Sequence, residues 1–166
     1  MATWSSAFAE QATSDLDAYN LLARSNLPSS HRLHYLQMWL EKLCKVYLWM
    51  PEAGIDELEL RAKHNVIEKV LPKLIKVYWR HIGFGQRPDT SRIQEICREI
   101  DLLHPAIDDG TRRRDNVEYP WRGVSGQIEV PAKWSFPIAG RLYSHPGRLL
   151  LEAAVRLTRN PAVFVR

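Results

Sequence analysis

The 166-residue chain is 45% hydrophobic and 25% charged, and its formal net charge is +4. This balance of apolar and charged residues argues against an intrinsically disordered chain, and the lack of a run of about 18 apolar residues argues against a transmembrane helix. We therefore expect one globular domain, residues 1–166, with a full hydrophobic core and no association with a membrane.

The positive charge lies in the C-terminal third of the sequence. Residues 1–111 carry 13 Lys and Arg against 15 Asp and Glu, whereas residues 112–166 carry 10 against 4. A basic segment of this kind suits an acidic partner such as RNA, and it is equally typical of a solvated basic surface.

The N-terminus and the cysteines bear on the cellular compartment. MATWSSAFAEQ lacks the basic and apolar segments of a secretory signal. Cys44 and Cys97 both fall in apolar helical patterns, which is typical of reduced thiols in a core. We therefore expect a cytoplasmic protein.

The first predicted helix follows an N-terminal arm. Residues 1–12 form either a loose arm or a short helical lead-in. Ser14 and Asp15 supply an N-cap for a first helix, and the polar segment 24–30 is typical of a turn that ends it.

The clearest helical pattern covers residues 31–49, and Pro51 cannot continue it. Apolar side chains recur there at steps of three and four, which predicts a broad buried face. This face consists of Leu36, Trp39, Leu40, Leu43, Val46, Tyr47 and Met50. The opposite stripe consists of His34, Gln37, Glu41 and Lys45. We expect this helix to be the centre of a bundle.

Residues 57–80 predict a third helix, which Pro72 interrupts. Its basic residues recur at helical steps on one side. These are Lys69, Lys73, Lys76 and Arg80. Such a stripe can follow a phosphate backbone, and it can also be the solvated face of an amphipathic helix.

Two further helices are indicated by their caps. Asp89 precedes an apolar pattern over residues 91–103. Ser144 precedes a final helix that has Pro146 in its first turn and ends before Asn160-Pro161. The sequence therefore predicts an all-α fold with five helices.

Residues 105–143 separate the fourth and fifth helices. They hold four prolines, four glycines and five aromatic residues. A disordered linker rarely carries so many aromatic residues. We expect a long ordered loop that packs on the bundle and includes a short hairpin near residues 126–130.

The sequence predicts neither a metal site nor a cofactor. His31 and His34 are three residues apart, but they have no nearby cysteine or carboxylate in a zinc-binding spacing. Walker loops and GxSxG elbows are also absent from the sequence.

Three stretches read together resemble the HEPN superfamily, small all-helical domains found beside minimal nucleotidyltransferases, in toxins and in defence ribonucleases. The stretches are DLDAYNLL at 15–22, LQMWLEKLCKVYL at 36–48 and HNV at 64–66. The matching residues are Asp15, Leu16, Leu21, Leu22, Gln37, Glu41, Lys42, Lys45 and His64. The NVEYPW sequence at 116–121 is similar to a Tyr-Pro element of some members, with Glu118 where those members often have arginine.

The resemblance implies a homodimer from a bacterial defence or toxin–antitoxin system that binds or cleaves RNA without a metal. Ribonuclease members carry Arg, four to six residues, then His. The histidine moves a proton and the arginine stabilises charge on phosphorus. Arg98 and His104 are the preferred match, and Arg24 and His31 are the fallback.

Further residues are candidates for contacts with RNA or a nucleotide. Lys42, Lys45 and His64 could bind phosphate, and three arginines beside aromatic residues are typical of single-stranded RNA sites. The remaining candidates are Arg112, Arg113, Arg114, Tyr119 and Trp121. Each has a structural alternative: His64 can face solvent, and Trp121 can fill the core.

Arginine with aromatic residues is also typical of protein interfaces. An alternative function is therefore a non-catalytic adaptor or antitoxin-like partner. It would bind a nucleotidyltransferase or another protein through the loop at 105–143.

Overall fold

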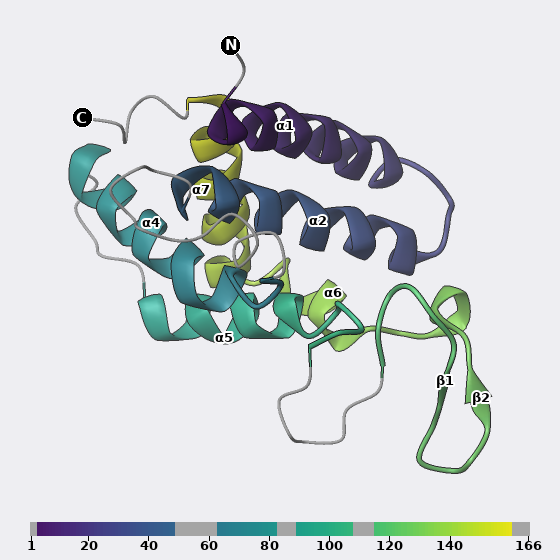
Figure 1. Cartoon of the computed structure of the whole chain (residues 1–166). Helices are drawn as coiled ribbons and strands as arrows, with labels where there is room; N and C mark the ends of the chain where they lie inside the picture. Colours follow the sequence, from purple (N-terminus) through teal and green to yellow (C-terminus); the bar gives the residue numbers. More distant parts are fainter. Residues whose placement is uncertain (1–2, 49–62, 83–88, 108–114, 161–166) are drawn as a thin grey trace.

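The computed structural model describes residues 3–48, 63–82, 89–107 and 115–160, and within these ranges the protein is all-α apart from one small hairpin (Figure 1). Its helices are α1 (Trp4–Leu22), α2 (Ser29–Leu48), α4 (Ile67–Ile82), α5 (Thr90–Asp101), α6 (Pro137–Arg141) and α7 (His145–Arg159). The prediction of an all-α fold is confirmed. Five helices correspond to the five expected ones, and the short helix α6 was not expected.

Helix α1 begins much earlier than the sequence pattern indicated. Thr3 and Ser6 form a capping box, in which each side chain bonds the backbone N–H of the other residue. The segment expected as a loose arm or a short helical lead-in is therefore, from Trp4 onward, the first half of the helix. Asp15 is not a cap, because it lies in the helix interior and is 5% exposed.

Helix α2 lies at the centre of the fold, as predicted, and contacts α1, α4, α5 and α7. Trp39 and Leu40 are fully buried. The polar stripe opposite the apolar face is buried as well, because helices pack on both sides of α2. Glu41 is 6% exposed and Lys45 is 4% exposed. This internal polar stripe positions the candidate site.

Helices α4 and α5 lie side by side below α2 (Figure 1). Helix α4 starts only at Ile67, so His64 lies just before it; residues 57–62 of the predicted helix lie outside the described residues. Asp89 caps α5 as expected, by accepting hydrogen bonds from the backbone N–H groups of Ser91 and Arg92. Ser144 likewise caps α7.

The described part of the loop before α7 is ordered and contains the expected hairpin, which projects beyond the helices (Figure 1). Strands β1 (Trp121–Arg122) and β2 (Ile128–Glu129) are antiparallel. Gly126 supplies the turn with a φ of 84°, a conformation that glycine adopts without strain. None of the described helices is long and apolar enough to cross a lipid bilayer.

Candidate functional site

A buried carboxylate on α2 is the base of the candidate site. Glu41 accepts hydrogen bonds from Gln37 Nε2 at 2.8 Å and from Lys45 Nζ at 2.7 Å. The three residues are four positions apart, so one face of α2 aligns them. Burial by itself would raise the pKa of Glu41, but the hydrogen bonds and the charge of Lys45 keep that pKa below its usual value. Glu41 is therefore ionised at neutral pH.

Two imidazoles cover this carboxylate. His64 Nδ1 lies 3.4 Å from both carboxylate oxygens of Glu41. The ring of His64 stacks on that of His104, with ring centroids 4.1 Å apart and an angle of 14° between the planes. Both histidines are half-buried, so each reaches solvent while touching the buried cluster. The arrangement joins α2, the start of α4 and the end of α5.

Asp101 holds the two histidine-bearing segments together. It ends α5, and its carboxylate accepts the N–H groups of Ile67 at 3.2 Å and of Glu68 at 2.8 Å. These groups belong to the first turn of α4, which has no partners for them within its own helix. His64 lies three residues before Ile67, and His104 lies three residues after Asp101. The hydrogen bonds between Asp101 and the start of α4 therefore fix the separation of the two histidines.

Burial strongly affects Asp101. Its side chain is almost fully buried, which raises its pKa to about 7, although the two backbone N–H groups that it binds act in the opposite direction. Asp101 therefore changes its protonation state near neutral pH.

The hydrogen bonds assign different tautomers to the two histidines. His64 Nδ1 faces an ionised carboxylate, so in a neutral His64 the proton lies on Nδ1 and Nε2 is the acceptor. His104 Nδ1 accepts the N–H of Ala106 at 3.1 Å, so the proton of neutral His104 is on Nε2. The pair thus presents one acceptor and one donor.

His104 is neutral at physiological pH. Burial lowers its pKa below the usual 6.5, and the nearby imidazole of His64 lowers it further. The carboxylates of Glu118 and Glu41 oppose this shift without reversing it. Because Nδ1 accepts a backbone N–H, a second proton on His104 would also break that hydrogen bond.

The NVEYPW sequence forms the rim of the site. Asn116 Oδ1 accepts the N–H groups of Glu118 and Tyr119, and Val117 N–H binds the carbonyl of Leu103, next to His104. These bonds place the carboxylate of Glu118 3.7 Å from His34 Nδ1. A third imidazole and a second carboxylate therefore stand beside the pair.

The structure places the predicted Arg–His pairs differently. His104 belongs to the cluster, and the ring it stacks on is that of His64. Arg98 is exposed on α5, one turn before Asp101. Arg24 and His31 are both exposed near the turn between α1 and α2. His31 is ten residues before Glu41 on the same helix, which corresponds to about 15 Å.

The predicted lysine contacts are occupied by carboxylates. Lys42 Nζ binds Asp15 at 2.8 Å, and Lys45 Nζ binds Glu41 at 2.7 Å. A phosphate bound by either ammonium group would share it with the carboxylate or replace that carboxylate.

The other predicted contact residues lie in the loop before α7. Tyr119 is 61% exposed, whereas Trp121 is 9% exposed and packs edge-on against Trp134. The burial of Trp121 therefore agrees with the alternative that it is a core residue. Arg112, Arg113 and Arg114 lie outside the described residues.

Sequence reasoning did not assign Glu41, Asp101, His34 or Glu118 to the site. The spacing of Gln37, Glu41 and Lys45 was visible, but it was interpreted as a polar stripe and as part of the HEPN resemblance, with Lys45 as a phosphate contact. His64 and His104 are far apart in the sequence, and no local pattern connects them. One signal was usable: a helix at the centre of a bundle is surrounded by other helices, so its polar stripe is expected to face them and not solvent.

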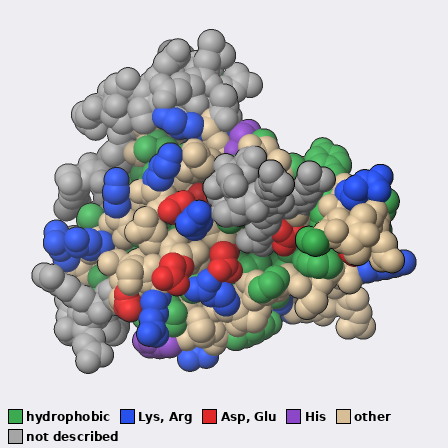
Figure 2. Space-filling model, turned by 90° about the horizontal axis from the view of Figure 1, so that it is seen from below, with side chains coloured by type: hydrophobic (Ala, Val, Ile, Leu, Met, Phe, Trp, Pro, Cys, Tyr) green, Lys and Arg blue, Asp and Glu red, His purple; other side chains and the backbone are tan. Residues whose placement is uncertain are grey.

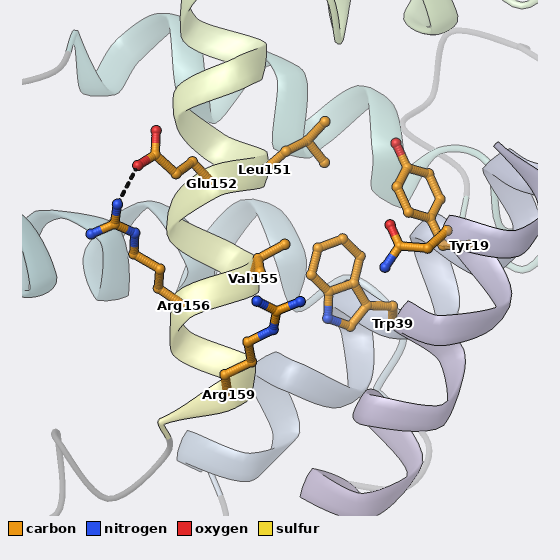
Figure 3. A pocket seen from close by; sticks show the side chains of 8 residues that line it. Tyr19, Trp39, Leu151, Glu152, Val155, Arg156 and Arg159 are labelled. Atoms are coloured by element: carbon orange, nitrogen blue, oxygen red, sulfur yellow. Dashed lines mark hydrogen bonds and ion pairs between the residues drawn. The ribbon is translucent and has the colours of Figure 1, made fainter. Parts of the chain in front are cut away.

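A second hollow lies on another side of α2. A pocket of about 390 Å³ is formed by α1, α2 and α7, with the indole of Trp39 at its base (Figure 3). Arg159 points toward Trp39, whereas Arg156 turns away to bind Glu152 at 2.7 Å (Figure 3). Among the described residues that line this pocket there is no imidazole or thiol, and the one carboxylate, that of Glu152, is paired with Arg156.

Comparison of the chain with protein-family models, curated proteins and solved structures found no match. The functional argument therefore rests on the residues and their geometry.

Proposed function

We propose that this protein is a HEPN-like endoribonuclease that binds RNA and cleaves it without a metal, as a cytoplasmic component of a bacterial defence or toxin–antitoxin system. The observation that carries the proposal is the stacked pair of His64 and His104 above the buried carboxylate of Glu41. Such a cluster supplies a proton acceptor and a hydrogen-bond donor in one place, which is what cleavage by an internal nucleophile requires.

The two tautomers suggest a division of roles. His64 Nε2 accepts the proton of a ribose 2′-hydroxyl, whose oxygen attacks the adjacent phosphorus. His104 Nε2–H donates a hydrogen bond to a phosphoryl oxygen as negative charge develops there. The bond from phosphorus to the 5′ oxygen breaks, and the proton held by His64 passes to that oxygen. The products are a 2′,3′-cyclic phosphate and a free 5′-hydroxyl.

The exposed surface of α4 supports RNA binding. Its basic stripe faces solvent, and none of its members pairs with a carboxylate in the ranges that the structure describes. The stripe consists of Lys69, Lys73, Lys76 and Arg80. Figure 2 shows the molecule from below, and basic side chains are spread over the half of this view where α4 and α5 lie. The stripe starts one turn after His64, so a bound phosphate backbone would lead toward the histidines.

Cleavage of a mixed RNA pool in the presence of EDTA tests the proposal. We expect the wild type to cut, and we expect His64→Ala and His104→Ala to lose about 10² to 10⁴ in rate, the usual contribution of acid–base groups. His31→Ala is the matched control, because His31 is exposed on α2 and outside the cluster. Circular dichroism would confirm that each variant folds. Absence of cutting by the folded wild type, or equal cutting by all variants, would contradict the proposal.

A specific observation also favours the adaptor function. The hairpin exposes large apolar side chains: Ile128 is 60% exposed, and Val124 at its tip is fully exposed. Exposed apolar side chains that are close together are typical of protein interfaces. If the protein is an adaptor, a tagged wild-type chain should retain a nucleotidyltransferase or another protein that a Val124→Ser, Ile128→Thr variant does not. Recovery of the same partner protein in equal amounts with both chains would contradict the adaptor function.

A further inference from the structure

The site holds three groups that could act as metal ligands. One ligand atom each from Glu41, His64 and His104 lies within 4.8 Å of the others. They are separated by 23 and 40 positions in the sequence, so spacing could not reveal them. The closest approach is that of His64 Nδ1 to the two oxygens of Glu41, 3.4 Å in each case.

The 3.4 Å separation between His64 Nδ1 and each oxygen of Glu41 also fits two ligands of one metal ion. Two ligands of a tetrahedral zinc ion, bound at about 2.0–2.1 Å, lie roughly 3.3 Å apart. A strong hydrogen bond to a carboxylate is shorter, at about 2.7–2.9 Å. The nitrogen and the two oxygens therefore already have the spacing of one edge of a zinc tetrahedron. A ligand atom of His104 lies within 4.8 Å of them, and its ring must turn out of the parallel stack to direct a nitrogen lone pair at the same ion.

The ligand types select the class of ion. Two imidazoles with one carboxylate suit Zn²⁺ and similar first-row transition metals, whereas Mg²⁺ and Ca²⁺ prefer oxygen ligands alone. Three protein ligands leave a fourth position open on a tetrahedral ion. The half-buried histidines provide access from solvent.

The carboxylate is already held in place for such an ion. Gln37 binds one oxygen of Glu41 and Lys45 binds the other, so each oxygen keeps a lone pair free on the side of His64. The charge of Lys45 opposes a cation at this position, and the carboxylates of Glu41 and Glu118 favour it.

We propose that Glu41, His64 and His104 bind a single Zn²⁺-type ion. A neutral imidazole bound to a metal through one nitrogen carries its proton on the other. His104 must therefore release the N–H of Ala106 when the ion binds, whichever nitrogen it uses. The ion also takes up His64, which moves the proton, and His104, which binds the phosphoryl oxygen, so Zn²⁺ inhibits RNA cleavage; this last consequence alone rests on the proposed function.

Isothermal titration of the full chain with Zn²⁺ tests the site without any RNA. We expect one ion per chain in the wild type and in His31→Ala, and about tenfold or more weaker binding in His64→Ala and in His104→Ala. In ¹⁵N spectra, Zn²⁺ should shift the backbone amide of Ala106 in the wild type and not in His104→Ala.

Failure of the metal site and failure of the ribonuclease give different results. Zn²⁺ affinity that is equal in the wild type, His64→Ala and His104→Ala, or absent in the folded wild type, overturns the metal site. Zn²⁺ binding by a wild type that does not cut RNA in EDTA leaves the metal site standing and removes only the proposed cleavage.

Discussion

Two buried carboxylates, Asp15 and Glu41, each pair with a lysine of α2, yet their surroundings differ. Asp15 lies between α1 and α2, where its two oxygens bind Lys42 Nζ at 2.8 Å and Gln11 Nε2 at 3.0 Å. Glu41 has an equivalent lysine and glutamine, and it also faces the imidazole of His64. The Asp15–Lys42 ion pair is therefore a contact between two helices, whereas the Glu41–Lys45 ion pair is part of a larger polar cluster.

This difference separates structural from chemical use of a buried charge. The Asp15–Lys42 ion pair joins two helices and has no reactive neighbour among the described residues. The carboxylate of the Glu41–Lys45 ion pair contacts the imidazole of His64, which in turn stacks on His104. Changes at Asp15 should therefore affect stability alone, whereas changes at Glu41 should affect both stability and chemistry.

The largest expected effect follows from Glu41→Gln. It breaks the buried ion pair of Glu41 with Lys45, and breaking a buried ion pair from one side costs about 3–5 kcal/mol of unfolding free energy. RNA cleavage should also fall about 100-fold or more, because His64 loses its orienting carboxylate. Urea unfolding and the EDTA cleavage assay measure the two effects.

The double variant Glu41→Gln, Lys45→Met separates these two effects. It replaces both members of the ion pair and should recover part of the lost stability without recovering cleavage. Recovery of cleavage along with stability would show that Glu41 has only a structural role.

Asp101 is a third buried carboxylate, and it predicts a pH dependence. Its folded-state pKa of about 7 lies above the ordinary value of 3.8 for an aspartate in an unfolded chain. The native state therefore binds more protons than the unfolded state between these values. The contribution of Asp101 to the unfolding free energy is therefore fully present below about pH 4 and is lost as the pH rises through about 7. Its upper bound is about 4 kcal/mol.

Comparison with Asp101→Asn isolates this contribution. The unfolding free energy of the wild type minus that of the variant should fall between pH 4.5 and pH 7.5, roughly following the titration of one carboxyl group. A difference that is independent of pH would show that Asp101 does not titrate in this range.

Asp15→Asn should have a smaller effect. The variant weakens a partly buried ion pair, and we expect a loss of about 1–3 kcal/mol in unfolding free energy. Cleavage by the folded variant should equal that of the wild type. A loss of cleavage under conditions where the variant is fully folded would end the distinction between the two carboxylates.

The smallest expected effect is a shift in the titration of His104. Because burial and His64 lower its pKa, the ring signals of His104 should titrate below pH 6.5 in ¹H–¹⁵N spectra. In His64→Ala this pKa should move upward, since one of the causes of its depression is removed. An unchanged titration would show that the stacked rings do not interact electrostatically.

The sequence predicted the helices because their signals are local. Apolar residues at steps of three and four revealed α2, and Asp89 and Ser144 marked the starts of α5 and α7 as expected. The start of α1 was wrong because a capping box of Thr3 and Ser6 was overlooked. Helix α6 is only five residues long, too short to show a helical period.

The candidate site was much less visible in the sequence. His104 was chosen as half of an Arg–His motif, and His64 as a separate phosphate contact, but their stacking depends on how α4 and α5 pack. Gln37, Glu41 and Lys45 had an unambiguous spacing, yet periodicity alone cannot say whether a polar stripe faces water or a neighbouring helix. That information is tertiary, and it appears only when all the helices around α2 are placed.

The bond from Asp101 to the start of α4 has a further consequence, for hydrogen exchange. The amide protons of Ile67 and Glu68 are held by a side chain from another helix, so they can exchange only when α4 and α5 separate. That separation also parts the two imidazoles. Exchange at these two amides should therefore report how often the cluster comes apart, with each opening a cooperative event that involves both helices.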